Sequence, residues 1–174
     1  MFNLKTLVIV LTLVSSTSVS DSNLLRQDHG LIKGKTTPLQ QEEKKCIAEA
    51  LWHEARGEGL EGMKYVLSVI HNRKESKQYS GTYCKVIKQY KQFSYRNNFP
   101  KEKVLDIARK PVGASEEQVK GLVLELAENA SKGLFKPLLK PSVLHYHTSD
   151  VKPYWKAAFR TEVQHGKHVF LVKK

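Results

Sequence analysis

The sequence predicts an α+β domain that is mainly helical and carries a small antiparallel sheet at its C-terminal end. Apolar residues recur at helical spacing in segments spread over residues 42–132. After Val143 the pattern changes to short runs rich in β-branched and aromatic residues, which are typical of strands. A chain of 174 residues, 40% of them hydrophobic, is suited to one domain with one core.

The first two predicted helices, Glu42–Arg56 and Leu60–Glu75, flank an acidic turn that contains two glycines. Gly57 and Gly59 mark where one helix ends and the next begins. Glu54 lies in the last turn of the first helix, where a carboxylate can be held while it faces a cleft.

The middle of the chain predicts shorter elements and one long helix. They are a short helix and turn over Cys84–Tyr95, a loop at Asn97–Pro100, a helix over Glu102–Ala108 and a helix over Ser115–Lys132. In the last of these, Ser115 is the expected N-cap, two glutamates occupy the first turn and Gly133 follows the end.

Three strands are predicted at the C-terminal end. They are Val143–His147, Phe159–Gln164 and His168–Val172, with a turn at His165–Lys167 between the last two. Of His145 and His147, one is expected to face the interior and the other the solvent.

The N-terminal residues 1–20 are predicted to be a signal peptide. Lys5 supplies a positive charge, Leu7–Val14 is a short apolar run, and small residues precede Asp21. The apolar run is too short for a stable membrane span. An uncleaved signal-anchor is the alternative.

Two regions follow the signal peptide. Residues 21–41 show no sustained period and are interrupted by Pro38, so they are interpreted as a flexible linker. Residues 42–174 form the predicted functional domain, which we expect to be a monomer exported to the periplasm or cell wall.

Cys46 and Cys84 are the two cysteines of the chain, and in an oxidising compartment they predict a disulfide. Two buried free thiols are the alternative if the signal peptide is wrongly assigned.

A set of short motifs occurs in a characteristic order along the chain. They are E-A-R-G-E at Glu54–Glu58, E-G at Glu61–Gly62, N-R at Asn72–Arg73, C-x-V at Cys84–Val86 with Q-F-S at Gln92–Ser94, and L-H-Y-H at Leu144–His147 with P-x-W at Pro153–Trp155 and G-x-H-x-F at Gly166–Phe170. Together they resemble the SleB/CwlJ-type cell-wall hydrolases, a family of spore-cortex lytic enzymes and their bacterial and phage relatives. Tyr95 departs from the Trp that is common in the family, and Lys101–Lys140 matches little of its pattern.

The resemblance implies a lysozyme-like (lytic transglycosylase-like) domain that acts on peptidoglycan glycan strands. Its implied activity is cleavage of the bond between N-acetylmuramic acid (MurNAc) and N-acetylglucosamine (GlcNAc), without a cofactor. Glycoside cleavage needs a proton donor with a raised pKa. Glu54 suits this role, because the negative end of a helix dipole raises the pKa of a carboxyl there, and the resemblance assigns acid/base catalysis to the same residue.

The role of a second carboxylate stays open. Glu58 is expected to be a structural partner of Arg56, with a second catalytic carboxylate as the lesser interpretation. A lytic transglycosylase needs none, because the 6-hydroxyl of muramic acid attacks the anomeric carbon and leaves a 1,6-anhydro end. A muramidase would instead use Glu58 or Glu61 to activate water.

Several side chains are candidates for binding the saccharide. Flat rings pack on sugar faces, and amides, hydroxyls and charged groups bond to sugar hydroxyls. The candidate substrate-binding residues are Arg56, Glu58, Gln92, Ser94, Tyr95, Tyr146 and His147, whereas Phe93, Trp52 and Trp155 are expected in the core.

The balance of 29 Lys+Arg against 17 Asp+Glu, a formal net charge of +12, predicts attraction to polyanions. Nucleic acid is not expected, because the chain is predicted to be exported and has no nucleic-acid motif. Anionic cell-envelope polymers, such as stem-peptide carboxylates, teichoic acids or lipopolysaccharide phosphates, fit better.

Two other functions remain as alternatives. A zinc-dependent peptidoglycan amidase or endopeptidase is suggested by the His53-Glu54 pair, but the helical zinc motif needs a second histidine at position 57, which is Gly57. The spacing of the C-terminal histidines matches no zinc pattern either, so no metal is expected. A non-catalytic basic wall-binding protein is the other alternative.

Overall fold

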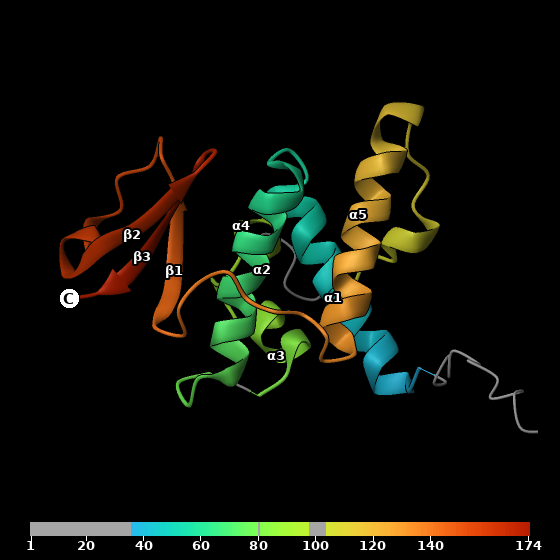
Figure 1. Ribbon diagram of the computed structural model, residues 1–174, viewed down its shortest axis with the longest axis horizontal. Coiled ribbons are helices and arrows are strands. Elements are labelled where there is room, and N and C mark those ends of the chain that lie inside the picture. The colour runs from blue at the N-terminus through green and yellow to red at the C-terminus, as the bar shows by residue number, and fades with distance from the viewer. Residues whose placement is uncertain (1–35, 80, 98–103) are drawn as a thin grey trace, which may run out of the picture. The chain divides into compact units, whose positions relative to one another are not determined.

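The computed structural model describes residues 36–79, 81–97 and 104–174, which belong to one compact unit (Figure 1). The predicted signal peptide, residues 1–20, lies outside the described residues, and so does the predicted linker up to residue 35. Within the described ranges, no helix is both long enough and apolar enough to cross a membrane.

Helix α1, Pro38–Ala55, begins four residues before its predicted start at Glu42. The Thr37 side chain accepts a hydrogen bond from the Gln40 backbone N–H, and the Gln40 side chain accepts one from Thr37, which together form a capping box. Pro38 occupies the first turn, where its missing N–H costs no helical hydrogen bond. The end of the predicted linker is therefore helical, and Pro38 starts the helix instead of interrupting a linker.

Helix α2, Gly59–Glu75, follows the glycine turn as predicted. Gly59 has a φ of +69°, a left-handed conformation that glycine adopts without strain. The short helix α3, Tyr83–Lys88, comes next and confirms a helix at this position.

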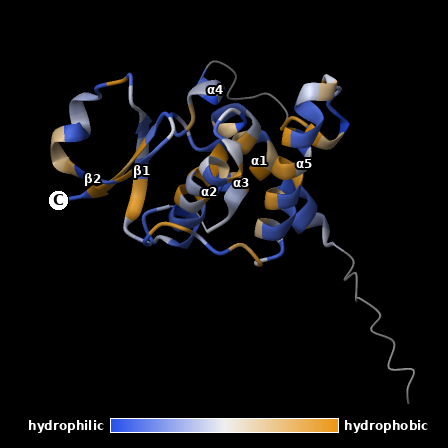
Figure 2. Ribbon diagram, turned by 45° about the horizontal axis from the view of Figure 1, so that its top comes forward, coloured by the Kyte–Doolittle hydropathy of each residue, from blue (hydrophilic) through white to orange (hydrophobic). Residues whose placement is uncertain are grey.

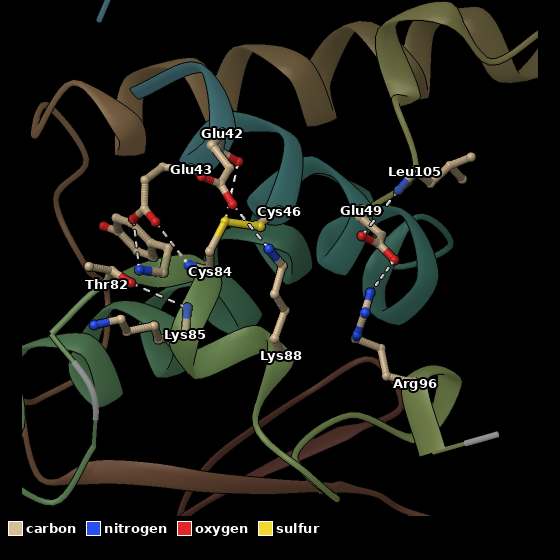
Figure 3. Close-up of a disulfide and its surroundings, with 11 residues drawn as sticks. Glu42, Glu43, Cys46, Glu49, Thr82, Cys84, Lys85, Lys88, Arg96 and Leu105 are labelled. Carbon is tan, nitrogen blue, oxygen red and sulfur yellow. Dashed lines mark hydrogen bonds and ion pairs between the residues drawn. A yellow bond between two sulfur atoms is a disulfide. The ribbon is translucent and has the colours of Figure 1, made fainter. Parts of the chain in front are cut away.

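The predicted disulfide between Cys46 and Cys84 is confirmed, and it joins α1 to α3 with 5.3 Å between the Cα atoms (Figure 3). A buried carboxylate lies beside it. Glu43 of α1 accepts hydrogen bonds from the backbone N–H groups of Tyr83 at 2.7 Å and of Cys84 at 3.1 Å, so it caps the start of α3.

The segment after α3 differs from its prediction. Helix α4, Ser94–Asn97, is followed by a single 3-10 turn η1, Ile107–Arg109, where a helix over Glu102–Ala108 was expected. Residues 98–103, which include most of the predicted loop, lie outside the described residues. The backbone N–H of Leu105 donates to the buried carboxylate of Glu49 at 3.3 Å, so that part of the segment is anchored to α1 and is not helical (Figure 3).

Helix α5, Ala114–Ser131, confirms the long helix, but its N-cap is Gly113 and not Ser115. Gly113 has an extended backbone, with φ of −69° and ψ of 163°, and no side chain caps the helix. Ser115 lies inside the first turn, because the helix begins one residue before it.

The C-terminal strands are β1, Val143–Thr148, β2, Phe159–His165, and β3, His168–Lys173. They form the predicted antiparallel sheet, with the predicted tight turn between β2 and β3, and the strand order is β1-β3-β2. The 3-10 turn η2, Tyr154–Ala158, lies between β1 and β2.

Helix α1 lies at the centre of the core and contacts α2, α3 and α5. Its middle carries the continuous buried stretch Cys46–Trp52, and Figure 2 shows apolar residues on α1, α2 and α5. The sheet packs on α2 through β1, and the ring of Tyr65 on α2 also lies 5.3 Å from that of Phe170 on β3, measured between centroids. Asn72 of α2 also donates to the backbone carbonyl of Val143 at 3.1 Å. The sheet is thereby held against the helical layer.

Candidate active site at the end of helix α1

Glu54 lies in the last turn of α1 and faces the sheet. Its Oε2 atom accepts a hydrogen bond from the hydroxyl of Tyr146 on β1, with 2.9 Å between the oxygens. The two residues are 92 positions apart in the chain. Packing of the sheet against the helices therefore brings together two residues that the sequence proposed separately, one as the acid and one as a substrate contact.

Burial raises the pKa of the Glu54 carboxyl above its usual value. The hydrogen bond from Tyr146 and the positive charge of Arg73 oppose this rise, because both favour the ionised form. The balance still favours the protonated form more than in an exposed glutamate, as a general acid requires.

Arg73 of α2 was assigned no role from the sequence. It is 5% exposed, and its Nε atom donates to the backbone carbonyl of Leu144 at 2.8 Å, which fixes the guanidinium beside β1. Its Nη1 atom has no hydrogen-bond partner among the described residues. A buried cation whose charge acts on both Glu54 and Tyr146 is part of the electrostatic environment of the site. The arginine in the N-R motif was a signal that could have indicated it.

Tyr95 of α4 packs against the end of α1. Its ring stacks on that of His53, with 4.5 Å between centroids and 12° between planes. Burial raises the pKa of the Tyr95 hydroxyl, and the negative charges of Glu49 and Glu54 raise it further. Tyr95, a predicted substrate-binding residue, is thus close enough to Glu54 for the Glu54 charge to affect its hydroxyl.

The other two residues of this segment are less directly connected to Glu54. Gln92 is half-buried in the turn after α3, and Ser94 is exposed at the start of α4. In the described ranges, neither side chain forms a hydrogen bond to Glu54. Phe93 between them is buried in the core, as expected.

Arg56 and Glu58 do not form the predicted pair. The Nη1 atom of Arg56 donates to the carbonyl of Trp52 at 2.9 Å, and Glu116 of α5 is 4.0 Å from its Nε. Glu58 instead accepts a hydrogen bond from the backbone N–H of Lys167, at 3.0 Å, in the turn between β2 and β3.

Two glycines explain why Glu58 reaches that turn. A Cβ on Gly166, whose φ is +53°, would lie 1.9 Å from the Oε2 atom of Glu58. A Cβ on Gly62 would lie 2.4 Å from the Cβ of Glu58. Because neither position has a side chain, the Glu58 side chain fits beside Gly62 and its carboxylate fits beside Gly166.

His147 lies on the opposite face of the sheet from Tyr146, as adjacent strand residues do. His145 and His147 both pack near Trp155, each with 6.1 Å between ring centroids, so the expectation that they face opposite ways is wrong. Residues two apart on a strand share a face. The buried His147 Nδ1 atom is 2.8 Å from the Thr148 carbonyl, and its Nε2 atom has no partner among the described residues.

Trp52, expected in the core, is buried, whereas Trp155 is only half-buried.

Over the described residues, no group of three or more histidine, cysteine, aspartate or glutamate side chains is arranged to hold a metal ion. His53, the residue that suggested zinc, stacks on Tyr95.

A family model and two solved structures are similar to this chain. A family model described as "Cell Wall Hydrolase" matches residues 57–171, so Glu54 lies just before the matched part. The catalytic domain of the Bacillus cereus SleB protein is similar in structure, with a TM-score of 0.52 and 25% identity over 75% of this chain and 90% of that one. The catalytic domain of the germination-specific lytic transglycosylase SleB from Bacillus anthracis has a TM-score of 0.55 and 24% identity, covering 75% and 94% of the two chains. No curated protein matches the chain.

Proposed function

The chain belongs to the cell wall hydrolase family, and on this premise we propose that Glu54 is the general acid/base of a glycosidase that cleaves peptidoglycan between MurNAc and GlcNAc. The family assignment makes the chain a peptidoglycan-degrading enzyme, and the similarity to SleB catalytic domains confirms the predicted lysozyme-like fold. The bond cleaved and the role of each residue are our proposal.

The surroundings of Glu54 carry the proposal. Its carboxyl has a raised pKa, lies at the end of a helix and is oriented by Tyr146 at 2.9 Å. Such a group can donate a proton to the glycosidic oxygen while positive charge develops on the sugar ring. Arg73 and Tyr146 stabilise the carboxylate that remains after donation.

We infer that the second half of the reaction uses the same carboxylate as a base. After the bond between MurNAc C1 and the GlcNAc O4 breaks, the proton from Glu54 stays on the released GlcNAc. The Glu54 carboxylate then removes the proton from the 6-hydroxyl of MurNAc as that oxygen bonds to C1. The product has a 1,6-anhydro end, and Glu54 is protonated again for the next cycle.

The position of Glu58 supports this route over hydrolysis. Its carboxylate is bonded to Lys167 N–H in the β2–β3 turn, and Glu61 is exposed on α2. A muramidase that activates water would need a second carboxylate facing the substrate. The similar Bacillus anthracis protein is described as a lytic transglycosylase, which agrees with this choice. The zinc amidase is retained as the alternative that the experiment below distinguishes.

The cellular location and the outer domain boundaries belong to the proposal as well. A cell wall hydrolase acts outside the cytoplasmic membrane, which agrees with the predicted signal peptide at residues 1–20. We propose export to the periplasm or cell wall and a catalytic domain that includes the whole of α1 from its cap at Thr37.

The test is mass spectrometry of purified peptidoglycan digested by the wild type, Glu54→Gln and Glu61→Gln, each with and without EDTA. We expect 1,6-anhydro-muramic ends that persist in EDTA. Glu54→Gln keeps the shape and loses the proton, so its rate should fall about 10²-fold or more. The exposed Glu61 is the matched control and should remain within a few fold of wild type.

The other outcomes contradict separate parts of the proposal. Reducing muramic ends would make the enzyme a muramidase. Free stem peptides released only without EDTA would replace the glycosidase by the zinc amidase. A Glu54→Gln variant that works at a near-normal rate would remove Glu54 from the catalytic role.

A further inference from the structure

Two cations lie against the Trp52 ring, on the side of α1 that faces α5. The guanidinium carbon of Arg56 lies 5.6 Å from the centroid of the buried Trp52 ring, and the Nζ atom of Lys110 lies 5.5 Å from the same centroid. Arg56 comes from the end of α1 and Lys110 from the segment after η1. The fold therefore concentrates positive charge near the catalytic helix end.

Both cations are held in place by other parts of the chain. Arg56 donates to the Trp52 carbonyl, and the ammonium group of Lys120 donates to the Lys110 carbonyl at 3.0 Å. Contacts over the indole ring restrict the two cationic groups further. Two cations that are positioned before a ligand arrives lose less conformational freedom when they bind it.

Little negative charge balances this pair. Glu116 is 4.0 Å from Arg56 and is itself about half exposed, which makes a weak ion pair. Within the described chain, no carboxylate forms an ion pair with Lys110. Burial lowers the pKa of the neighbouring His53, and the charges of Arg56 and Lys110 lower it further, so the positive field acts at the residue next to Glu54.

We propose that Arg56 and Lys110 bind carboxylates of the peptide stems of peptidoglycan while Glu54 acts on the adjacent glycan strand. This proposal rests on the proposed function, because the stem is attached to the MurNAc residue whose bond Glu54 would cleave. Neutral sugars carry no charge for two adjacent cations to bind, whereas the stem carries carboxylates close to the scissile bond. A guanidinium fork binds a carboxylate with two hydrogen bonds, and the lysine adds a point charge.

The experiment compares one wall preparation in two charge states. Sacculi are stripped of teichoic acids, and half are amidated with a carbodiimide and methylamine, which neutralises carboxylates and leaves the glycan intact. Binding of wild type, Arg56→Gln/Lys110→Gln and the control Lys85→Gln/Lys156→Gln is measured by co-sedimentation on ice. The control removes the same charge from two exposed lysines that have no ion pair among the described residues.

We expect wild type and control to bind the untreated sacculi about three- to tenfold more tightly than the amidated sacculi. The Arg56→Gln/Lys110→Gln variant should lose most of this preference. Arg56→Lys, which keeps the charge, should retain most of the preference, and equal melting temperatures establish that the variants are folded.

Three results would overturn the proposal. The double variant could retain the wild-type preference, or the control could lose it to the same extent. In a parallel assay on sacculi that keep their teichoic acids, the defect could occur there alone, which would identify phosphate as the ligand. Sedimentation needs no bond cleavage. Failure of the glycosidase reaction, seen in the products, is therefore distinguishable from failure of carboxylate binding.

Discussion

At the scale of single residues, opposing effects set the proton affinity of Glu54. Burial raises its pKa, whereas the Tyr146 hydroxyl and the Arg73 guanidinium lower it. The acid therefore releases its proton more readily than burial alone would permit, and it regains the proton because burial still penalises the charge. This balance suits a group that must donate and accept a proton in one cycle.

Replacing Tyr146 by Phe should move the alkaline limb of the activity profile to higher pH. The hydroxyl stabilises the carboxylate, so its loss raises the Glu54 pKa and keeps the acid protonated to a higher pH. The dependence of kcat/KM on pH measures the shift, and the exposed Tyr90→Phe is the control. An unchanged limb, or one moved to lower pH, would show that Tyr146 does not act on Glu54.

At the scale of elements, Glu58 connects two turns that lie far apart in the sequence. The residue precedes α2, and its carboxylate binds the β2–β3 turn at Lys167. Strand β3 pairs with β1, which carries Tyr146, so this contact helps to hold the sheet where Tyr146 meets Glu54.

A double-mutant cycle between Glu58 and Gly166 tests that contact. Gly166→Ala would place a Cβ against the Glu58 carboxylate, so its cost should be about 0.5–3 kcal/mol smaller in a Glu58→Ala background. Urea unfolding gives the four free energies. Gly133→Ala is the matched control, because Gly133 also has a positive φ, +74°, but an added Cβ would meet nothing within 4 Å. Additive costs at Gly166 would indicate that Glu58 does not occupy this position.

The disulfide should stabilise the junction of α1 and α3. It closes a separation of 38 residues, so its reduction should lower the free energy of unfolding by about 2–4 kcal/mol. Thermal melts with and without reductant measure the effect. In a Cys46→Ala/Cys84→Ala variant the reductant should change nothing. An unchanged melt of the wild type on full reduction would contradict the prediction.

At the scale of the whole molecule, the described unit extends N-terminal to the predicted boundary at residue 42. Helix α1 is the central element of the core, and its capping box lies at Thr37 and Gln40. A domain that starts at Glu42 would lack the first turn of its central helix.

A fragment of residues 36–174 should therefore be more stable than one of residues 42–174. Loss of the N-cap alone costs about 1 kcal/mol, and loss of the first turn adds to it. Thermal melts of the two fragments measure the difference, and Thr37→Ala in the longer fragment isolates the cap. Equal melting temperatures would place the stability of α1 elsewhere.

Local patterns in the sequence were sufficient for most elements. Local signals predicted helices at the positions of α1, α2, α3 and α5, and they predicted the sheet. These signals are the helical periods, the Gly57-Gly59 turn and the strand runs, and each depends on residues a few positions apart. The capping box at Thr37 and Gln40 was also a local signal, and it was missed because Pro38 was interpreted as an interruption. The same-face relation of His145 and His147 follows from the period of a strand and was likewise predictable.

The sequence by itself determined the family, the fold class, the disulfide and the candidate acid Glu54. The tertiary structure decided which side chains surround that acid. Tyr146 meets Glu54 across 92 residues, and Glu58 meets Lys167 across 109. Arg73 donates to the Leu144 carbonyl of β1, and Arg56 packs on Trp52, as Lys110 does, instead of pairing with Glu58. The physical reason is that local periods depend on hydrogen bonds and packing within a few residues, whereas these pairings depend on how the sheet and α5 pack against α1 and α2.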